Sequence, residues 1–405
     1  MGTKVGIEQM GIYWPSCCVK SETLAQVRGQ DPQKITLGLG IDSFVVPAPF
    51  EDAVTMAANA AQHLFENWQG ERSTIGRIVV ATESALDCAK PIAAYLHALL
   101  GLPPHCEAFD VKFACVAGTY ALLDALRYVR ATGRRALVIM SDIALYGPAS
   151  GSAEFTQGAG AAALLVSTNP LLAAINPDDT GTFTQDQDDF YRPVGHAEAV
   201  VNGKHSVECY LRSLAALDDY AHNTGAELFN PSSRKGAIWA MLFHVPYPGL
   251  PKKALNQVAV NYPRAHSNLD SMQELLQESL AIGRRIGNAY TASLYLCLAA
   301  LIAAKGAQAV GRKIGLYSYG SGSGAKFMVA SVGPGAATHS AHIKRAVEQL
   351  PELRNLSLEE YESMMFRHLV PANITFDHQH GFRLASTDPT GYRRYAAYNT
   401  EIHLD

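Results

Sequence analysis

The sequence predicts an α/β protein in which helices cover mostly parallel or mixed sheets. First, short β-branched runs alternate with segments of helical periodicity, which is the rhythm of βαβ units. Second, the 405 residues are 48% hydrophobic and 17% charged, which is a globular composition with ample material for a core. Third, the rhythm occurs twice, so we predict two similar halves, 1–167 and 168–405. By length alone, two to three domains or one large fused core are expected.

The first half contains four apolar runs that read as strands and two segments that read as helices. The predicted strands are 77–82, 109–113, 136–141 and 161–166, and the predicted helices are 91–100 and 119–131.

The second half repeats this order. The predicted elements are a strand at 236–243, helices at 268–285 and 290–304, and a hairpin of 313–319 with 326–332. The hairpin turn, 320–324, is rich enough in glycine for tight geometry or close approach to a ligand. The stretch 169–210 is polar and reads as a loop with a solvated face, although long loops often serve active sites. The tail, 340–405, reads as a helix with short strands.

Composition excludes several classes of protein. The net charge is −4 and no long Lys/Arg run occurs, so nucleic acid and an anionic membrane surface are not expected partners. The seven cysteines are odd in number and irregularly spaced, without a CxxC pair, which argues against a disulfide framework or a zinc site. The start does not read as a signal peptide, and the apolar stretch 290–304 is too short for a bilayer. We therefore expect a cytoplasmic protein.

Cys115 is the strongest nucleophile candidate. A strand-like run leads into it and a predicted helix follows it, so its sulfur is expected near a helix N-terminus, where the dipole favours the thiolate. The small residues Ala117, Gly118 and Thr119 come next and are expected to let a substrate approach. Taken alone, a buried structural cysteine is the commoner explanation.

Four further positions carry candidate chemistry. Glu83 ends a hydrophobic strand, where partial burial would raise its pKa for general base work; a strand-end Glu facing water is the alternative. His244 ends another apolar strand and could hydrogen-bond a carbonyl oxygen, or could be a satisfied core histidine. Asn288 could donate to an acyl oxygen or cap a helix. Lys253, with Lys252, could meet a phosphate or only solvate a helix start.

Ten stretches together resemble the 3-hydroxy-3-methylglutaryl-CoA (HMG-CoA) synthases of the thiolase superfamily. They run in family order across nearly the whole chain, and their combination is far more specific than any one of them. They are ATES (81–84), Ala-Cys (114–115), SDIALYG (141–147), FTQGAGA (155–161), DFYRP (189–193), VNGKHS (201–206), FHVPY (243–247), GNAYTASLYL (287–296), SYGSG (318–322) and FRLAS (382–386).

The resemblance implies a fold and a reaction. The fold would be thiolase-like, with two similar βαβ halves in a layered α-β-α-β-α core. Cys115 would take the acetyl group of acetyl-CoA, Glu83 would remove a proton from the acetyl methyl, and His244 would position the ketone of acetoacetyl-CoA. Hydrolysis would release HMG-CoA and CoA, a step of the mevalonate route to isoprenoids.

The resemblance also implies the surroundings of the reaction. No metal and no cofactor other than the CoA thioester substrates would be needed, and the protein would be a homodimer. The residues implied to bind or support the substrates are Asn288, Ser321, Asp142, Asp189, Tyr146, Thr156, Ser206 and Lys253.

The chain departs from the family pattern beside the nucleophile, where Val116 and Ala117 replace the usual Tyr-Gly, and at His205, where Tyr is common. The departures leave other readings open. One is a polyketide β-branching enzyme, which would act on chains carried by an acyl carrier protein. Another is a ketoacyl-ACP synthase III-like enzyme, against which ATES speaks because that class needs no such Glu. The last is a catalytically silent scaffold with the same fold.

Overall fold

One large mixed sheet dominates the fold. The structure, a computed structural model, describes residues 3–148, 150–196, 198–232, 237–338, 340–369 and 381–397. The sheet has nine strands in the order β11-β12-β13-β8-β1-β7-β6-β4-β5. They are β1 (Gly6–Tyr13), β4 (Ile75–Ala81), β5 (Glu107–Val111), β6 (Arg135–Ala144), β7 (Gly158–Ser167), β8 (Ala173–Thr184), β11 (Ile238–Phe243), β12 (Lys313–Gly320) and β13 (Gly324–Val332).

The two halves of this sheet repeat one pairing pattern. In the first half, β4 and β6 are parallel, while β6–β7 and β7–β1 are antiparallel. In the second half, β11 and β12 are parallel, while β12–β13 and β13–β8 are antiparallel. Among the strands that the structure describes, the two halves of the sheet pair with each other through β1 and β8, at Gly6↔Ala174 and Ile7↔Ala173. The expectation of two similar halves is therefore confirmed, and the boundary after residue 167 stays a prediction.

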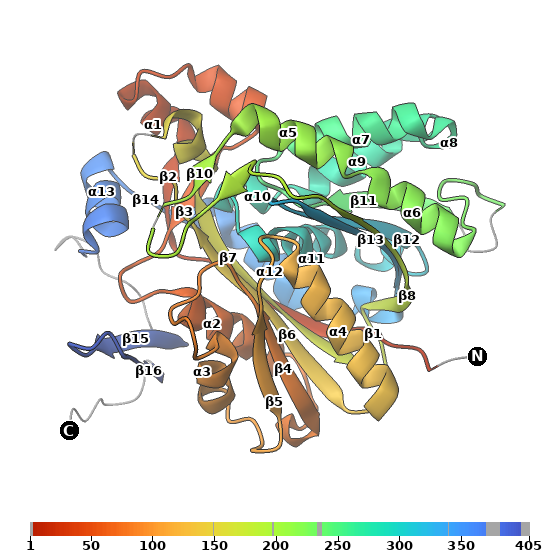
Figure 1. The fold of residues 1–405 in the computed structure, drawn as a ribbon, viewed down its shortest axis with the longest axis horizontal. Coiled ribbons are helices and arrows are strands. Elements are labelled where there is room, and N and C mark those ends of the chain that lie inside the picture. The colour runs from red at the N-terminus through yellow and green to blue at the C-terminus, as the bar shows by residue number, and fades with distance from the viewer. Residues whose placement is uncertain are drawn as a thin grey trace.

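Helices separate and cover the two halves of the sheet. They are α1 (Ser21–Val27), α2 (Ala53–Glu66), α3 (Ile92–Leu99), α4 (Ala117–Thr132), α5 (Gly203–Arg212), α6 (Ala215–Thr224), α7 (Gly249–Asn261), α8 (Pro263–His266), α9 (Leu269–Ser279), α10 (Gly283–Ile286), α11 (Ser293–Lys305), α12 (Ala341–Gln349) and α13 (Leu358–Arg367). In Figure 1, α4 and α11 lie between the two halves, α2 and α3 cover one outer face, and α6, α7 and α9 lie over the other. This is the layered α-β-α-β-α arrangement that the family resemblance implies.

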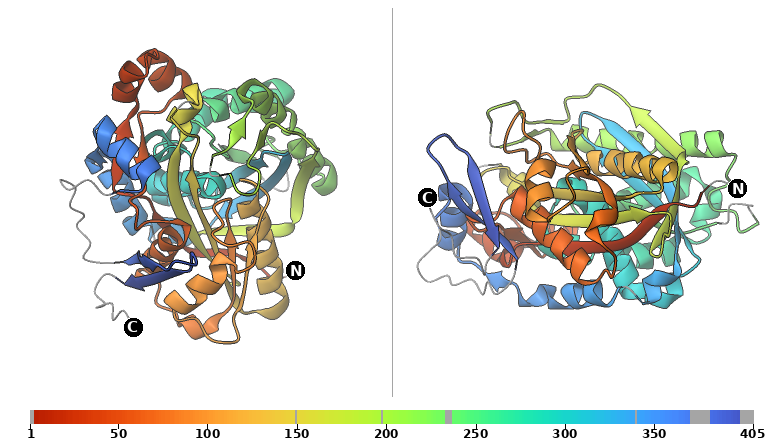
Figure 2. Two further views of the ribbon diagram at one scale, coloured as in Figure 1. Left: turned by 60° about the vertical axis from the view of Figure 1, so that its left-hand side comes forward. Right: turned by 90° about the horizontal axis from the view of Figure 1, so that it is seen from below.

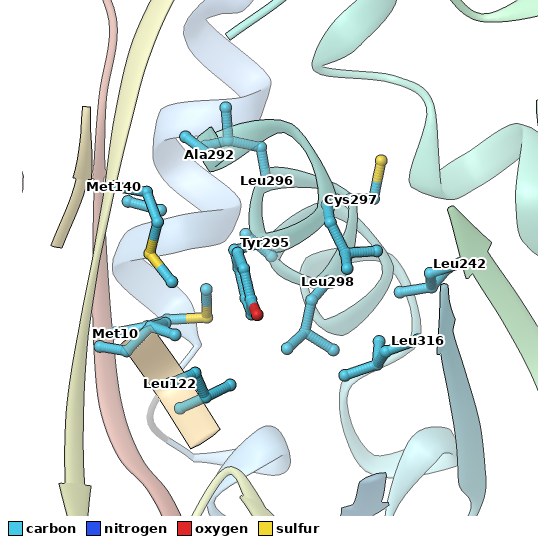
Figure 3. Packing of buried hydrophobic residues seen from close by; sticks show 14 of the residues in the cluster. Met10, Leu122, Met140, Leu242, Ala292, Tyr295, Leu296, Cys297, Leu298 and Leu316 are labelled. Atoms are coloured by element: carbon cyan, nitrogen blue, oxygen red, sulfur yellow. The ribbon is translucent and has the colours of Figure 1, made fainter. Parts of the chain in front are cut away.

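Helix α11 forms the centre of the core because its side chains are apolar on all sides. Figure 3 shows Tyr295 between Met10 and Met140 of one half of the sheet and the leucines of the other, Leu242 and Leu316. The stretch Tyr290–Ala309 has the length and mean hydropathy (1.4) of a membrane span, but 72% of that apolar window is buried in the protein. A helix that sheets cover on both sides is apolar all round because it is buried in the protein, so this composition does not require a membrane.

Three small sheets complete the described chain. They are β2 (Cys17–Lys20) between β3 (Ser43–Val46) and β14 (Arg354–Asn355), the pair β9 (Phe190–Tyr191) with β10 (Val200–Val201), and the hairpin β15 (Phe382–Thr387) with β16 (Arg393–Ala397). Figure 2 shows the hairpin at the end of the molecule opposite the N-terminus. Arg393 and Tyr395 of this hairpin bond to Asp52, the residue that caps α2.

Two expectations about secondary structure were wrong. The stretch 169–210 is not a loop, because it contains the twelve-residue strand β8, the short strands β9 and β10, and most of α5. In β8 the exposed Asn176 and Asp178 alternate with the buried Ile175 and Pro177, so the polar residues are the outer face of a strand. The predicted helix 268–285 is broken into α9 and α10 by a turn that buries Leu280 and Ile282.

Candidate active site

A cavity of about 330 Å³ opens between the first and second halves of the chain. Cys115, Tyr146 and Thr156 line it from the first half, and His244 and Asn288 from the second. The remaining lining residues are Leu39, Ser150, Ser152, Ala153, Phe190, Val201, Gly203, Ser206, Val207, Pro246, Tyr247, Leu250, Tyr290 and Ser321. A larger hollow, about 660 Å³, lies beside Lys4, Arg130 and Lys313, and none of the candidate site residues lines it.

A strained turn presents Cys115 to the cavity. Ala114 has φ 41°, a left-handed conformation that alanine rarely adopts, and α4 begins at Ala117. Glycine at Gly118 is needed because a Cβ there would lie 2.7 Å from the carbonyl oxygen of Thr291. Gly118 therefore packs against the second half of the chain, as does Thr119 through its hydrogen bond to Tyr295. None of Ala117, Gly118 and Thr119 lines the cavity, so the expectation that they make room for a substrate was wrong.

The Cys115 thiol donates a hydrogen bond to Oε1 of Glu83 over 3.0 Å. Burial, and then the negative charge of Glu83, hold the pKa of Cys115 well above its usual value. The resting site therefore holds a protonated thiol. The expectation that the helix N-terminus would favour the thiolate was wrong, because desolvation and a neighbouring carboxylate outweigh a dipole.

Glu83 lies two residues beyond the end of β4, and the residue as a whole is partly buried. Burial of its carboxyl group and the charge of Asp142 raise the pKa of Glu83 to about 8, against the opposing effects of the Cys115 hydrogen bond and the Arg192 charge. A carboxylate with such a pKa is suited to take up and return a proton near neutral pH. Arg192 also donates from its guanidinium group to the backbone carbonyl of Glu83, so it is both a clamp and a nearby cation.

Asp142 holds the Glu83 turn in place from behind. Its carboxylate is fully buried and accepts hydrogen bonds from the backbone N–H of Glu83 (2.7 Å) and the hydroxyl of Ser84 (2.9 Å). Its second oxygen accepts the backbone N–H of Thr291 (3.1 Å) and that residue's hydroxyl. Asp142 does not line the cavity. It ties the two halves together beneath the site, so its implied role as a substrate contact becomes a positioning role.

His244 directly follows β11 and is 3% exposed. Its Nδ1 lies 2.6 Å from the hydroxyl oxygen of Ser293, and its backbone N–H donates to the carbonyl of Tyr317 over 2.8 Å. Burial lowers the pKa of His244 to about 3, so the ring is neutral across the physiological range. A neutral imidazole that lines the cavity can donate one hydrogen bond to a carbonyl oxygen.

Asn288 is brought to the cavity by a close contact between the halves. An isolated bridge joins Gly158 to Gly287, and a Cβ on Gly287 would lie 1.8 Å from the carbonyl oxygen of Gln157. The side-chain oxygen of Asn288 accepts the backbone N–H of Tyr290 over 2.8 Å. Its NH₂ group is therefore the part available to a ligand. The alternative that Asn288 caps a helix was wrong, because the N-cap residues of the helical segments that follow are Ala289 and Ala292.

Asp189 supports the Gly-rich turn. It was part of the polar run that we expected to face solvent, yet it is fully buried. Its carboxylate accepts from the hydroxyl of Tyr319 (2.8 Å) and from the backbone N–H of Gly322 (2.9 Å). These bonds fix the turn that carries Ser321, so Asp189 positions a cavity residue and does not line the cavity itself.

An aromatic cluster forms the wall beside the nucleophile. The rings of Tyr146, Phe190 and Tyr290 meet edge to face, with centroids 5.9 to 6.5 Å apart. Val116 does not line the cavity; it packs beneath Gly320, where a Cβ would lie 2.8 Å from it. Val116, which stands where the family usually has Tyr, therefore contacts the Gly-rich turn and not the cavity itself.

The structure brings together most of the site residues expected from the sequence. Lining the cavity are Cys115, His244, Asn288, Ser321, Tyr146, Thr156 and Ser206, with Glu83 bonded to Cys115. Lys253 is exposed on α7, whose first turn lines the cavity through Leu250, and its phosphate role stays a prediction. Sequence reasoning missed Arg192, Thr291 and Ser293, although all three lie in stretches that carried the resemblance. Among the described residues, no group of three or more His, Cys, Asp or Glu side chains could hold a metal ion.

Known proteins match this chain over most of its length. The family model for the N-terminal part of hydroxymethylglutaryl-coenzyme A synthase matches residues 1–170, and the model for the C-terminal part matches residues 266–370. The hydroxymethylglutaryl-CoA synthase of Enterococcus faecalis is 35% identical over 364 residues, covering 89% of this chain and 91% of the relative. That of Haloferax volcanii is 35% identical over 380 residues, covering 80% of this chain and 83% of the relative.

Solved structures agree with these matches. MvaS in complex with 3-hydroxy-3-methylglutaryl coenzyme A superposes with a TM-score of 0.89 at 35% identity, covering 98% of this chain and 100% of that one. An HMG-CoA synthase complexed with CoA gives 0.86 at 30% identity, covering 97% and 99%. The HMG synthase of the curacin biosynthetic pathway, in complex with its acetyl donor-ACP, gives 0.86 at 26% identity, covering 97% and 99%.

Proposed function

We propose a catalytic cycle for this chain from one premise: the chain belongs to the hydroxymethylglutaryl-CoA synthase family. It is an acyltransferase that condenses acetyl-CoA with acetoacetyl-CoA and water to give HMG-CoA and CoA, a step of the mevalonate pathway. The observation that carries the residue roles is the 3.0 Å bond between Cys115 and Glu83, in a cavity that His244 also lines. One nucleophile, one carboxylate base and one carbonyl donor form a complete set for this chemistry.

In the first step, the Cys115 sulfur attacks the thioester carbonyl of acetyl-CoA. Glu83 accepts the thiol proton along the existing hydrogen bond, so the thiolate forms only as it attacks. The bond between the acetyl carbon and the CoA sulfur breaks, and the proton leaves with CoA as its thiol. Glu83 is then an ionised base again.

In the second step, Glu83 removes a proton from the methyl group of acetyl-Cys115. The resulting carbon nucleophile attacks the ketone carbon of acetoacetyl-CoA, and a carbon–carbon bond forms. A hydrogen bond from neutral His244 polarises the ketone oxygen, and the proton held by Glu83 returns to the new alkoxide. Water then cleaves the thioester, which restores the Cys115 thiol and releases HMG-CoA.

The decisive experiment separates the two half-reactions. Protein given radiolabelled acetyl-CoA alone is expected to carry label on Cys115, located by peptide mapping. Glu83→Ala is expected to keep detectable label and to form no HMG-CoA. Correctly folded wild-type protein without label would refute the role of Cys115, and normal condensation by Glu83→Ala would refute the role of Glu83.

We propose CoA, not an acyl carrier protein, as the carrier of the acceptor. Identity supports this choice, because the hydroxymethylglutaryl-CoA synthase of Enterococcus faecalis and MvaS are each 35% identical to this chain, while the carrier-protein-bound curacin enzyme is 26% identical. Acetoacetyl-CoA and an acetoacetyl-carrier protein, offered side by side at equal concentration, test it. A clear preference for the carrier protein would favour the polyketide β-branching function.

The remaining proposals concern assembly and setting. We propose a cytoplasmic homodimer that uses no cofactor beyond its CoA thioester substrates. The open edge of β5, the last strand of the sheet in the described part of the chain, supports a dimer because an unpaired edge can pair with a second copy. Light scattering at several concentrations tests the dimer, and monomers at all of them would contradict it.

A further inference from the structure

We infer that Ser293 is a positioning residue that fixes the His244 tautomer, so that Nε2 carries the ring proton and faces the substrate. The inference deepens the proposed function, because it assigns the hydrogen-bond donor on the ketone oxygen to one atom. It depends on two contacts of a single buried hydroxyl group and on the backbone that holds it.

The first contact is the one between the hydroxyl oxygen of Ser293 and Nδ1 of His244, at 2.6 Å. Both side chains are buried, at 5% and 3% exposure, so water does not compete for this bond. A neutral imidazole has one nitrogen that donates and one that accepts, and the partner of one nitrogen decides the state of the other.

The second contact supports one direction for the bond. The backbone N–H of Val245 donates to the same hydroxyl oxygen over 3.2 Å. With that N–H as its donor, the Ser293 oxygen is free to place its own proton on an acceptor, and Nδ1 is the acceptor at bonding distance. Nδ1 is then unprotonated, and Nε2 bears the hydrogen that points at the cavity.

The backbone holds this pair rigidly. The carbonyl of His244 accepts the hydroxyl of Tyr210 over 2.7 Å, and its N–H donates to Tyr317. Ser293 is the first residue of α11, which is enclosed in the core between the two halves of the sheet. The hydroxyl and the ring therefore keep their mutual orientation while the substrates change.

The test combines spectroscopy with the two half-reactions. In protein with ¹⁵N-labelled histidine, the ring signals of His244, assigned by comparison with His244→Asn, are expected to show protonated Nε2 and bare Nδ1. Ser293→Ala is expected to lose this signature and to slow condensation by roughly 10- to 100-fold, while acetylation of Cys115 keeps its wild-type rate. Ser293→Thr, which restores the hydroxyl, is expected to recover the signature and most of the rate.

Ser279→Ala is the matched control. Ser279 is also fully buried in a helix, but its hydroxyl donates to the carbonyl of Leu276, away from the site. This variant is expected to lose a similar buried bond and to condense normally. A wild-type signal with protonated Nδ1, or normal condensation by Ser293→Ala, would overturn the inference. Absence of acetylation in the wild type would instead refute the proposed function and leave the tautomer reading intact.

Discussion

The turns before α4 and α11 have the same backbone conformation, but their side chains have different roles. Ala114 and Tyr290 both have φ 41°, and each lies three residues before its helix begins. Cys115 and Thr291 therefore occupy equivalent positions in the two halves. The thiol of Cys115 faces the cavity, whereas the hydroxyl of Thr291 is held by Asp142 and by the carbonyl of Ala81.

The strand ends show the same division. Glu83 follows β4 and His244 follows β11, and these strands occupy equivalent places in their halves. Burial drives their pKa values in opposite directions, to about 8 for the carboxyl group and about 3 for the imidazole, because it disfavours the charged form of each. In the proposed cycle, the first half thus supplies the groups that move protons, and the second half supplies neutral hydrogen-bond donors and supporting residues.

Removal of the Cys115 thiol should have the largest effect on the rate of HMG-CoA formation. Cys115→Ala is expected to reduce HMG-CoA formation at least about a thousandfold, because no other group at the site can carry the acetyl chain. The melting temperature should change little. Cys88→Ala is the labelling control, since Cys88 is an exposed thiol. Label that persists in Cys115→Ala and vanishes in Cys88→Ala would reverse the assignment.

Neutralising the base should come next. Glu83→Gln keeps the shape of the side chain but cannot accept a proton, so condensation should fall by roughly 10²- to 10⁴-fold. Single-turnover measurements that start from acetylated protein isolate this step from acetyl transfer. A loss confined to the formation of acetyl-Cys115 would show that Glu83 serves the first step only.

Weakening the turn before α11 should lower both the stability of the fold and the rate of condensation. Thr291→Val removes a hydroxyl from the buried Asp142 carboxylate, which should cost about 1–3 kcal/mol in the free energy of unfolding. Denaturant titration measures this cost, and condensation should slow because the Glu83 turn loosens. Thr119→Val is the control. Its hydroxyl bonds Tyr295 over 2.8 Å and does not touch Asp142, so this variant should lose stability alone.

The smallest expected effect is a shift in pH dependence. Condensation should rise with pH through about 8 as Glu83 ionises, and His244, with a pKa of about 3, should add no step between roughly pH 5 and 9. Arg192→Gln keeps a donor for the Glu83 carbonyl but removes the charge that lowers the Glu83 pKa, so the rise should move to higher pH.

Arg192→Lys is the matched variant, because it keeps the charge and weakens the clamp. It should leave the midpoint of the rise near its wild-type value. If Arg192→Gln and Arg192→Lys shift the midpoint equally, the hydrogen bond from Arg192 to the Glu83 carbonyl sets the pKa of Glu83, and the charge of Arg192 does not.

Local sequence patterns predicted many of the elements and the candidate reactive residues of this protein. The strands β4 and β11 were predicted correctly from apolar runs that end at Glu83 and His244, and α4 from the helical periodicity after Cys115. Each of these patterns lies within a short stretch of consecutive residues. The same patterns failed for 169–210, since the alternation in β8 contains a proline and two aspartates, residues that are typical of turns.

Only the tertiary structure decided how the candidate groups act on one another. The protonated state of Cys115 depends on Glu83, 32 positions away, and the tautomer of His244 depends on Ser293, 49 positions away. Asp142 and Asp189 look like ordinary acidic residues in the sequence, yet burial turns them into anchors for the turns that carry Glu83 and Ser321. Desolvation and hydrogen-bond direction arise from neighbours that the fold brings together, and no local window of sequence contains them.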